Sequence, residues 1–338
     1  MTDAPATPEG VVPKPRFLAV DALRGYAILI VVVAHVIWGL RVAGAPIPDL
    51  FPRIYDWIYL YAAQLLFFVS GCLAGGSLRH GRKALVISKV RGILYPYVVW
   101  SVLTWCLRAL SPVKANAPAQ LEQMLLLFLH PYDIYWFLYE LFLFFMAYAA
   151  LSRAGNMALA AVATVLFSLH GFVSLPLALN LFCAHFFYFA LGAIVFPVLR
   201  EMVRESSSRR LLLALAVALF LMHAAGAREA LDVYGVRPYD DVLAAAPVLA
   251  ALFGFFFFFV WCRQGRTARM FVFLGGYSMQ IYVAHTIFTA GTRIALLRGL
   301  GLSDPWLHLA AGTVCGVLGP LILYGVLKKM RCDFLYRV

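Results

Sequence analysis

The sequence predicts an all-α protein, a polytopic transmembrane helix bundle of about ten spans with both termini in the cytoplasm. Of its 338 residues, 63% are hydrophobic and 13% are charged, against about 45–50% and about 25% in soluble proteins. Apolar runs extend along the whole chain, and a helical span needs about 20 such residues. Of the 28 lysines and arginines, 19 lie in segments expected inside and 8 in segments expected outside, as the positive-inside rule requires.

The apolar runs divide the chain into three parts. Residues 1–16 form a polar cytoplasmic arm that lacks the features of a cleaved signal peptide, so we expect the first span to direct insertion. Residues 17–328 form the transmembrane domain, and residues 329–338 form a cytoplasmic tail. The piece 121–130 is either a half-span or an interfacial helix. The expected spans are Phe17–Leu40, Ile54–Leu78, Val90–Leu110, Tyr132–Leu151, Met157–Leu169, Leu175–Leu199, Leu211–Ala225, Val242–Cys262, Phe271–Ala290 and Trp306–Leu327.

Several function classes are disfavoured. The net charge of +12 does not indicate nucleic-acid binding, because the basic residues lie in loops between apolar runs. The six cysteines lie mostly within those runs and form no CxxC pair, so we interpret them as small packing residues and expect no metal site. The sequence also lacks a Walker loop, an HExxH motif and a GxSxG elbow, which would indicate other chemistries.

The first span carries three ionisable residues on one face. Arg24 and His35 are 11 residues apart, a rotation of about 20° beyond three turns and a rise of about 16 Å. Asp21 precedes Arg24 by three residues and belongs to the same stripe. Ionisable groups within a span are costly and usually face the bundle interior. Two simpler interpretations stay open: Arg24 reaches the cytoplasmic headgroups, and His35 is a hydrogen-bonded core residue.

Later segments add further polar candidates. Glu140 follows an aromatic cluster that contains Trp136, and a carboxyl group inside a span needs a partner or an altered pKa. The rings of that cluster fit an interfacial aromatic belt equally well. Tyr282 and His285 lie inside the ninth expected span.

A basic loop covers residues 79–91 and is expected on the cytoplasmic side. It holds five cations, among them Arg79, Lys89 and Arg91. These charges either meet anionic lipid or bind the phosphates of an anionic cytosolic ligand.

Four motifs, in order along the chain, resemble the acyltransferase-3 family of integral membrane acyl-CoA-dependent O-acyltransferases. The most specific is Asp21-x-x-Arg24-Gly25, followed after ten residues by His35. The others are FFVSG in the second span, a basic run before YPY, and YWFL together with the late segment SMQIYVAH. The family often has paired arginines in the third motif, whereas this chain has SKVR at residues 88–91.

The resemblance implies transfer of an acyl group, most often acetyl from acetyl-CoA, to a hydroxyl of a cell-surface glycan or its lipid-linked precursor, in the bacterial inner membrane. It makes His35 the expected general base and Arg24 a donor-binding residue, with Asp21 orienting Arg24. Acyl-CoA is then a co-substrate rather than a bound cofactor, and membrane lipid is the other expected partner. The remaining expected contacts are Arg79, Lys89 and Arg91 to the donor, and Trp136, Glu140, Tyr282 and His285 to the acceptor.

Two other functions stay open at this point. A transporter or flippase of a glycan or lipid precursor would also place ionisable groups inside the bundle, although transporters often have two related halves, which this sequence does not show. A membrane sensor would bind acyl-CoA in the same place without turnover.

Overall fold

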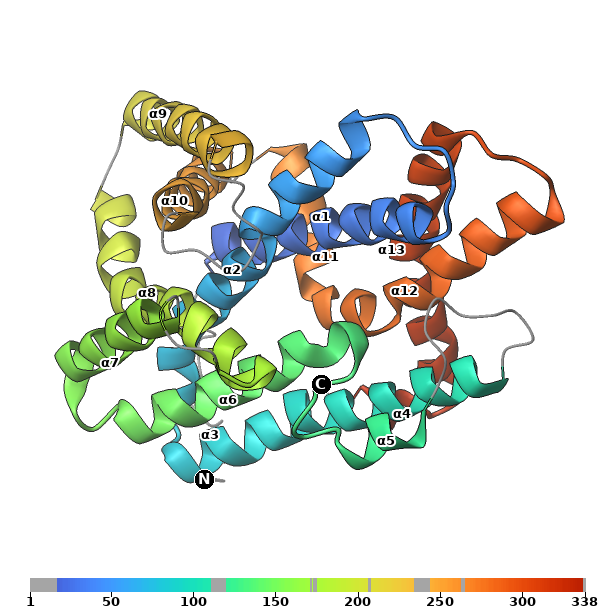
Figure 1. Cartoon of the computed structure of the whole chain (residues 1–338). Coiled ribbons are helices and arrows are strands. Elements are labelled where there is room, and N and C mark those ends of the chain that lie inside the picture. The colour runs from blue at the N-terminus through green and yellow to red at the C-terminus, as the bar shows by residue number, and fades with distance from the viewer. Residues whose placement is uncertain are drawn as a thin grey trace, which may run out of the picture.

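The computed structural model describes residues 17–110, 120–170, 172, 175–205, 208–233, 244–262 and 265–336. The expected arm at residues 1–16 therefore lies outside the described residues. All regular elements in the described ranges are helical (Figure 1), which confirms the predicted all-α class. The α-helices are α1 (Leu18–Val42), α2 (Leu50–Leu78), α3 (Arg82–Lys89), α4 (Tyr95–Leu110), α5 (Leu121–Leu125), α6 (Trp136–Leu151), α7 (Gly155–His170), α8 (Leu177–Glu205), α9 (Arg209–Arg228), α10 (Ala245–Trp261), α11 (Arg266–Gly276), α12 (Ser278–Ile294) and α13 (Pro305–Lys329).

Several of these helices are long enough to cross a membrane. In the described residues, seven helical stretches meet the length and hydropathy of a span, and α10 with α11, bent by 119°, makes an eighth if the pair is counted as one. The chain is thus a multi-pass helical protein. The total of about ten spans and the cytoplasmic position of both termini stay predictions. The piece 121–130 forms only the five-residue helix α5, which is too short to span a bilayer.

The prediction of the ninth span, Phe271–Ala290, as one continuous helix was wrong, because the structure has two helices there. Helix α11 ends at Gly276, Tyr277 leaves helical geometry with ψ 16°, and α12 begins at Ser278. Two consecutive glycines before the break weaken the helix, because glycine has a low helix propensity. Hydropathy alone could not reveal the interruption, since both pieces are apolar.

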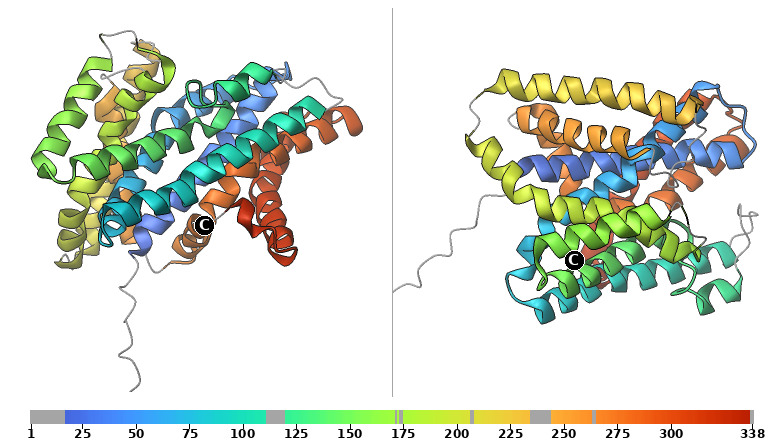
Figure 2. Two further views of the ribbon diagram at one scale, coloured as in Figure 1. Left: turned by 90° about the horizontal axis from the view of Figure 1, so that it is seen from below. Right: turned by 60° about the vertical axis from the view of Figure 1, so that its left-hand side comes forward.

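Helix α1 lies at the centre of the bundle. It contacts α2, α10, α11, α12 and α13, and these helices surround it in Figure 1. Figure 2 shows α9 and α10 along one edge of the bundle and α3 with α4 along the opposite edge. A polar residue on α1 is therefore well placed to face the protein interior.

Two helix crossings bring backbones into direct contact. A Cβ on Gly25 of α1 would lie 1.8 Å from the Phe271 carbonyl oxygen, and one on Gly275 of α11 would lie 1.9 Å from the Asp21 carbonyl oxygen. At the second crossing, a Cβ on Gly71 of α2 would lie 2.0 Å from a carbonyl oxygen of α8. Small residues permit such close approach in membrane bundles. The glycines in the DxxRG and FFVSG motifs thus have a packing role.

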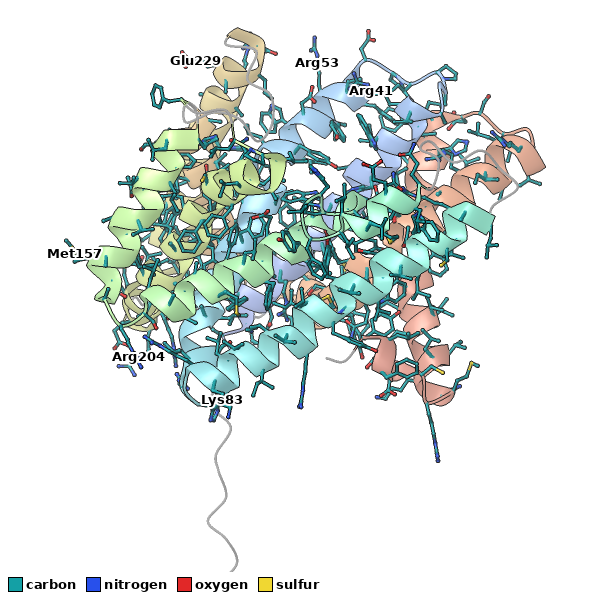
Figure 3. The ribbon with its side chains drawn as sticks, turned by 60° about the horizontal axis from the view of Figure 1, so that its bottom comes forward. Arg41, Arg53, Lys83, Met157, Arg204 and Glu229 are labelled. Atoms are coloured by element: carbon teal, nitrogen blue, oxygen red, sulfur yellow. The ribbon has the colours of Figure 1, made fainter. Side chains whose placement is uncertain are left out.

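Charged side chains lie at opposite ends of the bundle. Figure 3 shows Arg41 and Arg53 at one end and Lys83 and Arg204 at the other. The sequence places the first two outside and the last two inside, so their separation agrees with the expected alternation.

The described part of the C-terminal tail folds back onto the bundle. The Trp100 indole of α4 donates a hydrogen bond to the Leu335 carbonyl oxygen at 3.2 Å. The Tyr336 side chain is buried, with its ring 5.2 Å from those of Trp100 and Tyr324. The tail therefore contacts both α4 and α13.

Candidate active site

The first turns of α1 place Asp21 and Arg24 side by side. A guanidinium nitrogen of Arg24 lies 3.1 Å from a carboxylate oxygen of Asp21, and the two side chains are 31% and 17% exposed respectively. The adjacent crossing of Gly25 with Gly275 holds this part of α1 against α11. Asp21 and Arg24 thus form an ion pair, and the expected role of Asp21 in orienting Arg24 stays a prediction.

His35 lies farther along the same helix. Because α1 is unbroken from Leu18 to Val42, helix geometry keeps Arg24 and His35 on one face, about 16 Å apart along the axis. The Nδ1 of His35 lies 2.8 Å from the Val31 carbonyl oxygen. A carbonyl oxygen only accepts, so this hydrogen bond assigns the proton of a neutral ring to Nδ1 and the lone pair to Nε2. Nε2 is the atom with which His35 can take a proton.

A second imidazole lies against the first. The rings of His35 and His285, from α1 and α12, have centroids 4.8 Å apart and an edge-to-face angle of 77°. His285 is fully buried, and its Nδ1 lies 2.7 Å from the Tyr282 carbonyl oxygen. Its Nε2 is buried and has no hydrogen-bond partner. Both rings therefore have the same tautomer when neutral, with each Nε2 left unprotonated.

A pocket of about 450 Å³, part of it open space, lies beside His35. Its walls come from α1, α2, the start of α6 and α12, and they are mostly apolar. Such a concave apolar site with a few polar groups is the usual form of a small-molecule site. The lining residues are Val31, Ala34, His35, Ile58, Tyr59, Ala62, Ala63, Leu66, Ile134, Trp136, Phe137 and Tyr282.

Two hydrogen bonds connect the walls of this pocket. The Tyr282 hydroxyl of α12 donates to the Ile134 carbonyl oxygen, and the Tyr135 hydroxyl donates to the Val283 carbonyl oxygen at 2.8 Å. They tie the segment before α6 to α12 in both directions. Trp136, the first residue of α6, lines the pocket and lies 5.6 Å from the ring of His185. The expected contacts Trp136, Tyr282 and His285 thus gather around His35.

Glu140 lies apart from the residues that surround His35. It lies one turn after Trp136 on α6, is 0% exposed, and neither carboxylate oxygen has a hydrogen-bond partner. It is not among the residues that line the pocket. A buried acid without partners costs free energy, and its role in binding the acceptor stays a prediction.

The expected donor-binding cations lie away from the pocket. Arg79 at the end of α2 and Arg91 after α3 are exposed. Lys89 is partly buried, and its ammonium nitrogen lies 4.0 Å from the centre of the Phe145 ring of α6. Arg24 also does not line the pocket. Any contact between these cations and the polar part of a ligand that reaches His35 would require a long ligand.

Sequence reasoning missed several wall residues. Tyr59 has its ring 6.2 Å from that of His35, and Phe137 stacks on Phe67 at 4.5 Å. Ala62 and Leu66 give the α2 wall its shape. In the sequence, the pocket on this helix was indicated only by the adjacent alanines Ala62 and Ala63. Small residues within a span of bulky apolar residues leave space in which a ligand can bind.

The fold and the site define a multi-pass helical membrane protein with a histidine-lined pocket inside the bundle. A family model described as an acyltransferase domain matches residues 17–325, so the chain belongs to the acyltransferase-3 family, as its motifs predicted. A search of curated proteins and a search of solved structures found no match. The family and the membrane-span-like helices support a membrane acyltransferase.

Proposed function

We propose that the protein transfers an acyl group, acetyl in the first instance, from a cytosolic acyl-CoA to a hydroxyl of a cell-surface glycan or its lipid-linked precursor. The observation that carries this proposal is the position and hydrogen bonding of His35. Its Nδ1 is engaged by Val31 and its ring lines a pocket inside the bundle. General-base catalysis of acyl transfer to a hydroxyl needs a positioned proton acceptor, and the fixed tautomer makes Nε2 of His35 such an acceptor.

The reaction needs one proton acceptor. His35 Nε2 takes the proton of the acceptor hydroxyl while that oxygen attacks the thioester carbonyl carbon. The carbon–oxygen bond forms, the carbon–sulfur bond breaks, and the coenzyme leaves as a thiolate that recovers the proton from the imidazolium. Direct transfer of this kind leaves His35 unmodified, whereas an acyl-imidazole intermediate would require Nε2 itself to attack the carbonyl carbon.

His285 assists as a positioning residue. Its ring packs edge-to-face on His35 and is itself held by Tyr282. Such packing limits the rotation of the His35 ring, and a fixed base is more effective than a mobile one.

The donor is expected to enter from the end of α1 that carries Arg24. Acyl-CoA has several phosphates and a long pantetheine arm. Arg24 pairs with Asp21 at that end of the helix, and the roughly 16 Å between Arg24 and His35 is a distance that such an arm can cover. Lys89 and the exposed cations Arg79 and Arg91 supply further positive charge for the phosphates.

The test uses the purified full-length chain in proteoliposomes, with labelled acetyl-CoA and membrane glycan. Label should move to the glycan with wild-type protein. Mass spectrometry of surface glycans from a deletion strain should show the loss of an O-acyl group. Unchanged glycans, together with no transfer of label by folded protein, would overturn the proposal.

A further inference from the structure

A cation lies near His35, on the side away from Arg24. Arg293 is in the last turn of α12, and its side chain reaches α1, where Nη1 lies 2.1 Å from the position that a Cβ on Gly39 would occupy. Gly39 follows His35 by about one helical turn, and Cβ positions four residues apart lie about 5–6 Å from each other. The guanidinium nitrogen therefore lies within about 8 Å of the His35 Cβ.

The glycine at position 39 makes this contact possible. Gly39 is buried. Apart from its chain neighbours and the backbone of its own helix, a Cβ there would come within 4 Å of only two atoms, and both belong to the Arg293 guanidinium. The guanidinium thus occupies the space that a side chain of α1 would take at this position, and Arg293 is half-buried.

Arg293 has no counter-charge in the described part of the chain. The four ion pairs found there are made by other arginines. Taking a cation out of water without a partner costs free energy, and an anionic group of a ligand would offset this cost. Arg293 is therefore suited to bind an oxyanion beside the proposed base.

The place of this cation along α1 indicates the acceptor rather than the donor. The contact at Gly39 lies between His35 and Arg41, and Arg41 is at the end of the bundle opposite Lys83 (Figure 3). The donor phosphates are expected at the other end of α1, where Arg24 lies. An oxyanion at Arg293 would then belong to the second substrate.

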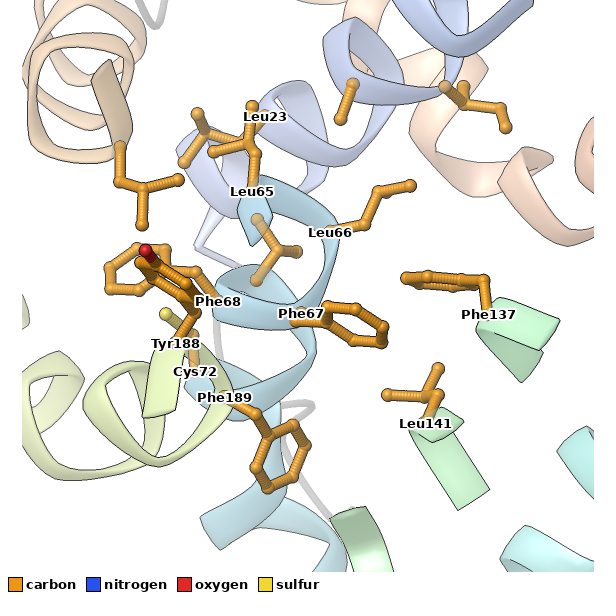
Figure 4. Close-up of a cluster of buried hydrophobic side chains, with 14 of the residues drawn as sticks. Leu23, Leu65, Leu66, Phe67, Phe68, Cys72, Phe137, Leu141, Tyr188 and Phe189 are labelled. Carbon is orange, nitrogen blue, oxygen red and sulfur yellow. The ribbon is translucent and has the colours of Figure 1, made fainter. Parts of the chain in front are cut away.

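The side chains of α1 and its neighbours on the Arg24 side of His35 are largely apolar. Leu23 of α1, Leu65 of α2 and Phe137 of α6 belong to one buried cluster (Figure 4). Such side chains cannot pair with an oxyanion, which costs free energy when it is buried alone. A charged group of a ligand bound at His35 would thus find its partner on the Arg293 side.

We propose that Arg293 binds an oxyanion of the acceptor glycan, a carboxylate or a phosphate group, while a hydroxyl of that glycan lies at Nε2 of His35. The inference rests on the proposed acyl transfer and adds that the acceptor is anionic. A guanidinium can pair with either group through two parallel hydrogen bonds. The short separation of Arg293 and His35 lets the charge and the hydroxyl lie on the same sugar or on neighbouring sugars.

The experiment uses the full-length protein in proteoliposomes with labelled acetyl-CoA and membrane glycan in three forms: untreated, with its carboxylates reduced to alcohols, and with its phosphate groups removed. With wild type, one of the two treatments should lower kcat/KM for the glycan about tenfold or more, as expected for the loss of a charge-assisted contact. Arg293→Gln should show a similar loss with untreated glycan and no further loss after that treatment. Its KM for acetyl-CoA should equal that of wild type.

Two control variants separate the contact from general effects of charge and packing. Arg53→Gln removes an exposed cation from the same end of the bundle as Arg41 and should transfer like wild type. Gly39→Ala keeps the charge but displaces the guanidinium, so it should also lower transfer to untreated glycan. Its own control is Gly291→Ala on α12, where no atom apart from chain neighbours and the backbone of the same helix lies within 4 Å of the Cβ position.

The outcomes separate the two proposals. The treatment that lowers wild-type transfer identifies the oxyanion as carboxylate or phosphate. If neither treatment lowers it, or if Arg293→Gln loses as much with treated as with untreated glycan, as it would if Arg293 served lipid headgroups, the inference is overturned. If folded wild type transfers label to none of the three forms, the proposed function itself fails. Should Arg293→Gln not fold, a loss by Gly39→Ala confined to untreated glycan supports the inference, and no loss overturns it.

Discussion

The imidazole rings of His35 and His285 meet edge-to-face, 4.8 Å apart, although the two residues lie near opposite ends of the chain. Each ring uses its Nδ1 on a backbone carbonyl oxygen of its own helix. These hydrogen bonds leave Nε2 of each neutral ring unprotonated and able to accept a hydrogen bond. The two histidines differ in position, because of the two only His35 lines the pocket.

His35→Ala should reduce acyl transfer by about 10²–10⁴-fold, the usual contribution of a general base. Donor binding should persist, because the proposal assigns the coenzyme phosphates to other residues. Transfer of labelled acetyl from acetyl-CoA and equilibrium binding of acetyl-CoA measure the two effects separately. Turnover equal to wild type would remove His35 from the mechanism.

His285→Gln should lower kcat and leave the KM for acetyl-CoA nearly unchanged, since the residue supports His35 rather than the donor. His170→Gln is a matched control. His170 is also buried, bonds a carbonyl oxygen three residues earlier through Nδ1, and has a buried Nε2 without a hydrogen-bond partner. Steady-state kinetics give kcat and KM for both variants. Equal kcat values for His285→Gln and His170→Gln would refute the positioning role of His285.

Arg24→Ala should raise the KM for acetyl-CoA about tenfold or more, because a charge-assisted contact with phosphate contributes about 1.5–3 kcal/mol. Arg204→Ala removes an arginine from an exposed pair with the same spacing, Glu201 and Arg204, and should have little effect. The KM of each variant is read from initial rates at varied acetyl-CoA. A KM for Arg24→Ala within twofold of wild type would mean that the donor binds elsewhere.

Gly25→Ala should destabilise the protein by about 1–3 kcal/mol or more, the cost of forcing an extra carbon into packed structure. Its Cβ would lie 1.8 Å from a backbone oxygen of α11. Gly76→Ala provides the comparison, because no atom apart from its chain neighbours and the backbone of its own helix lies within 4 Å of the position of its Cβ. Thermal unfolding in detergent should show a lower midpoint for Gly25→Ala only, and equal midpoints would contradict the observed crossing.

Much of the architecture follows from local sequence. Composition and hydropathy predicted an all-α membrane bundle, because the length and apolarity of a span are properties of a continuous segment. The ends of α1 and α2 lie within a few residues of the predicted spans. The Asp21–Arg24 pair and the shared face of Arg24 and His35 also follow from helical spacing alone. The motifs gave the family, which the match over residues 17–325 confirms.

The sequence by itself determined the class of protein, the family and one helix face with a guanidinium and an imidazole. Only the tertiary structure decided that His285 lies against His35, that the chain breaks at Tyr277, and that residues of α1, α2, α6 and α12 line one pocket. The reason is physical: periodicity reports which face of a helix is apolar, whereas the neighbour on that face depends on how helices far apart in sequence pack together.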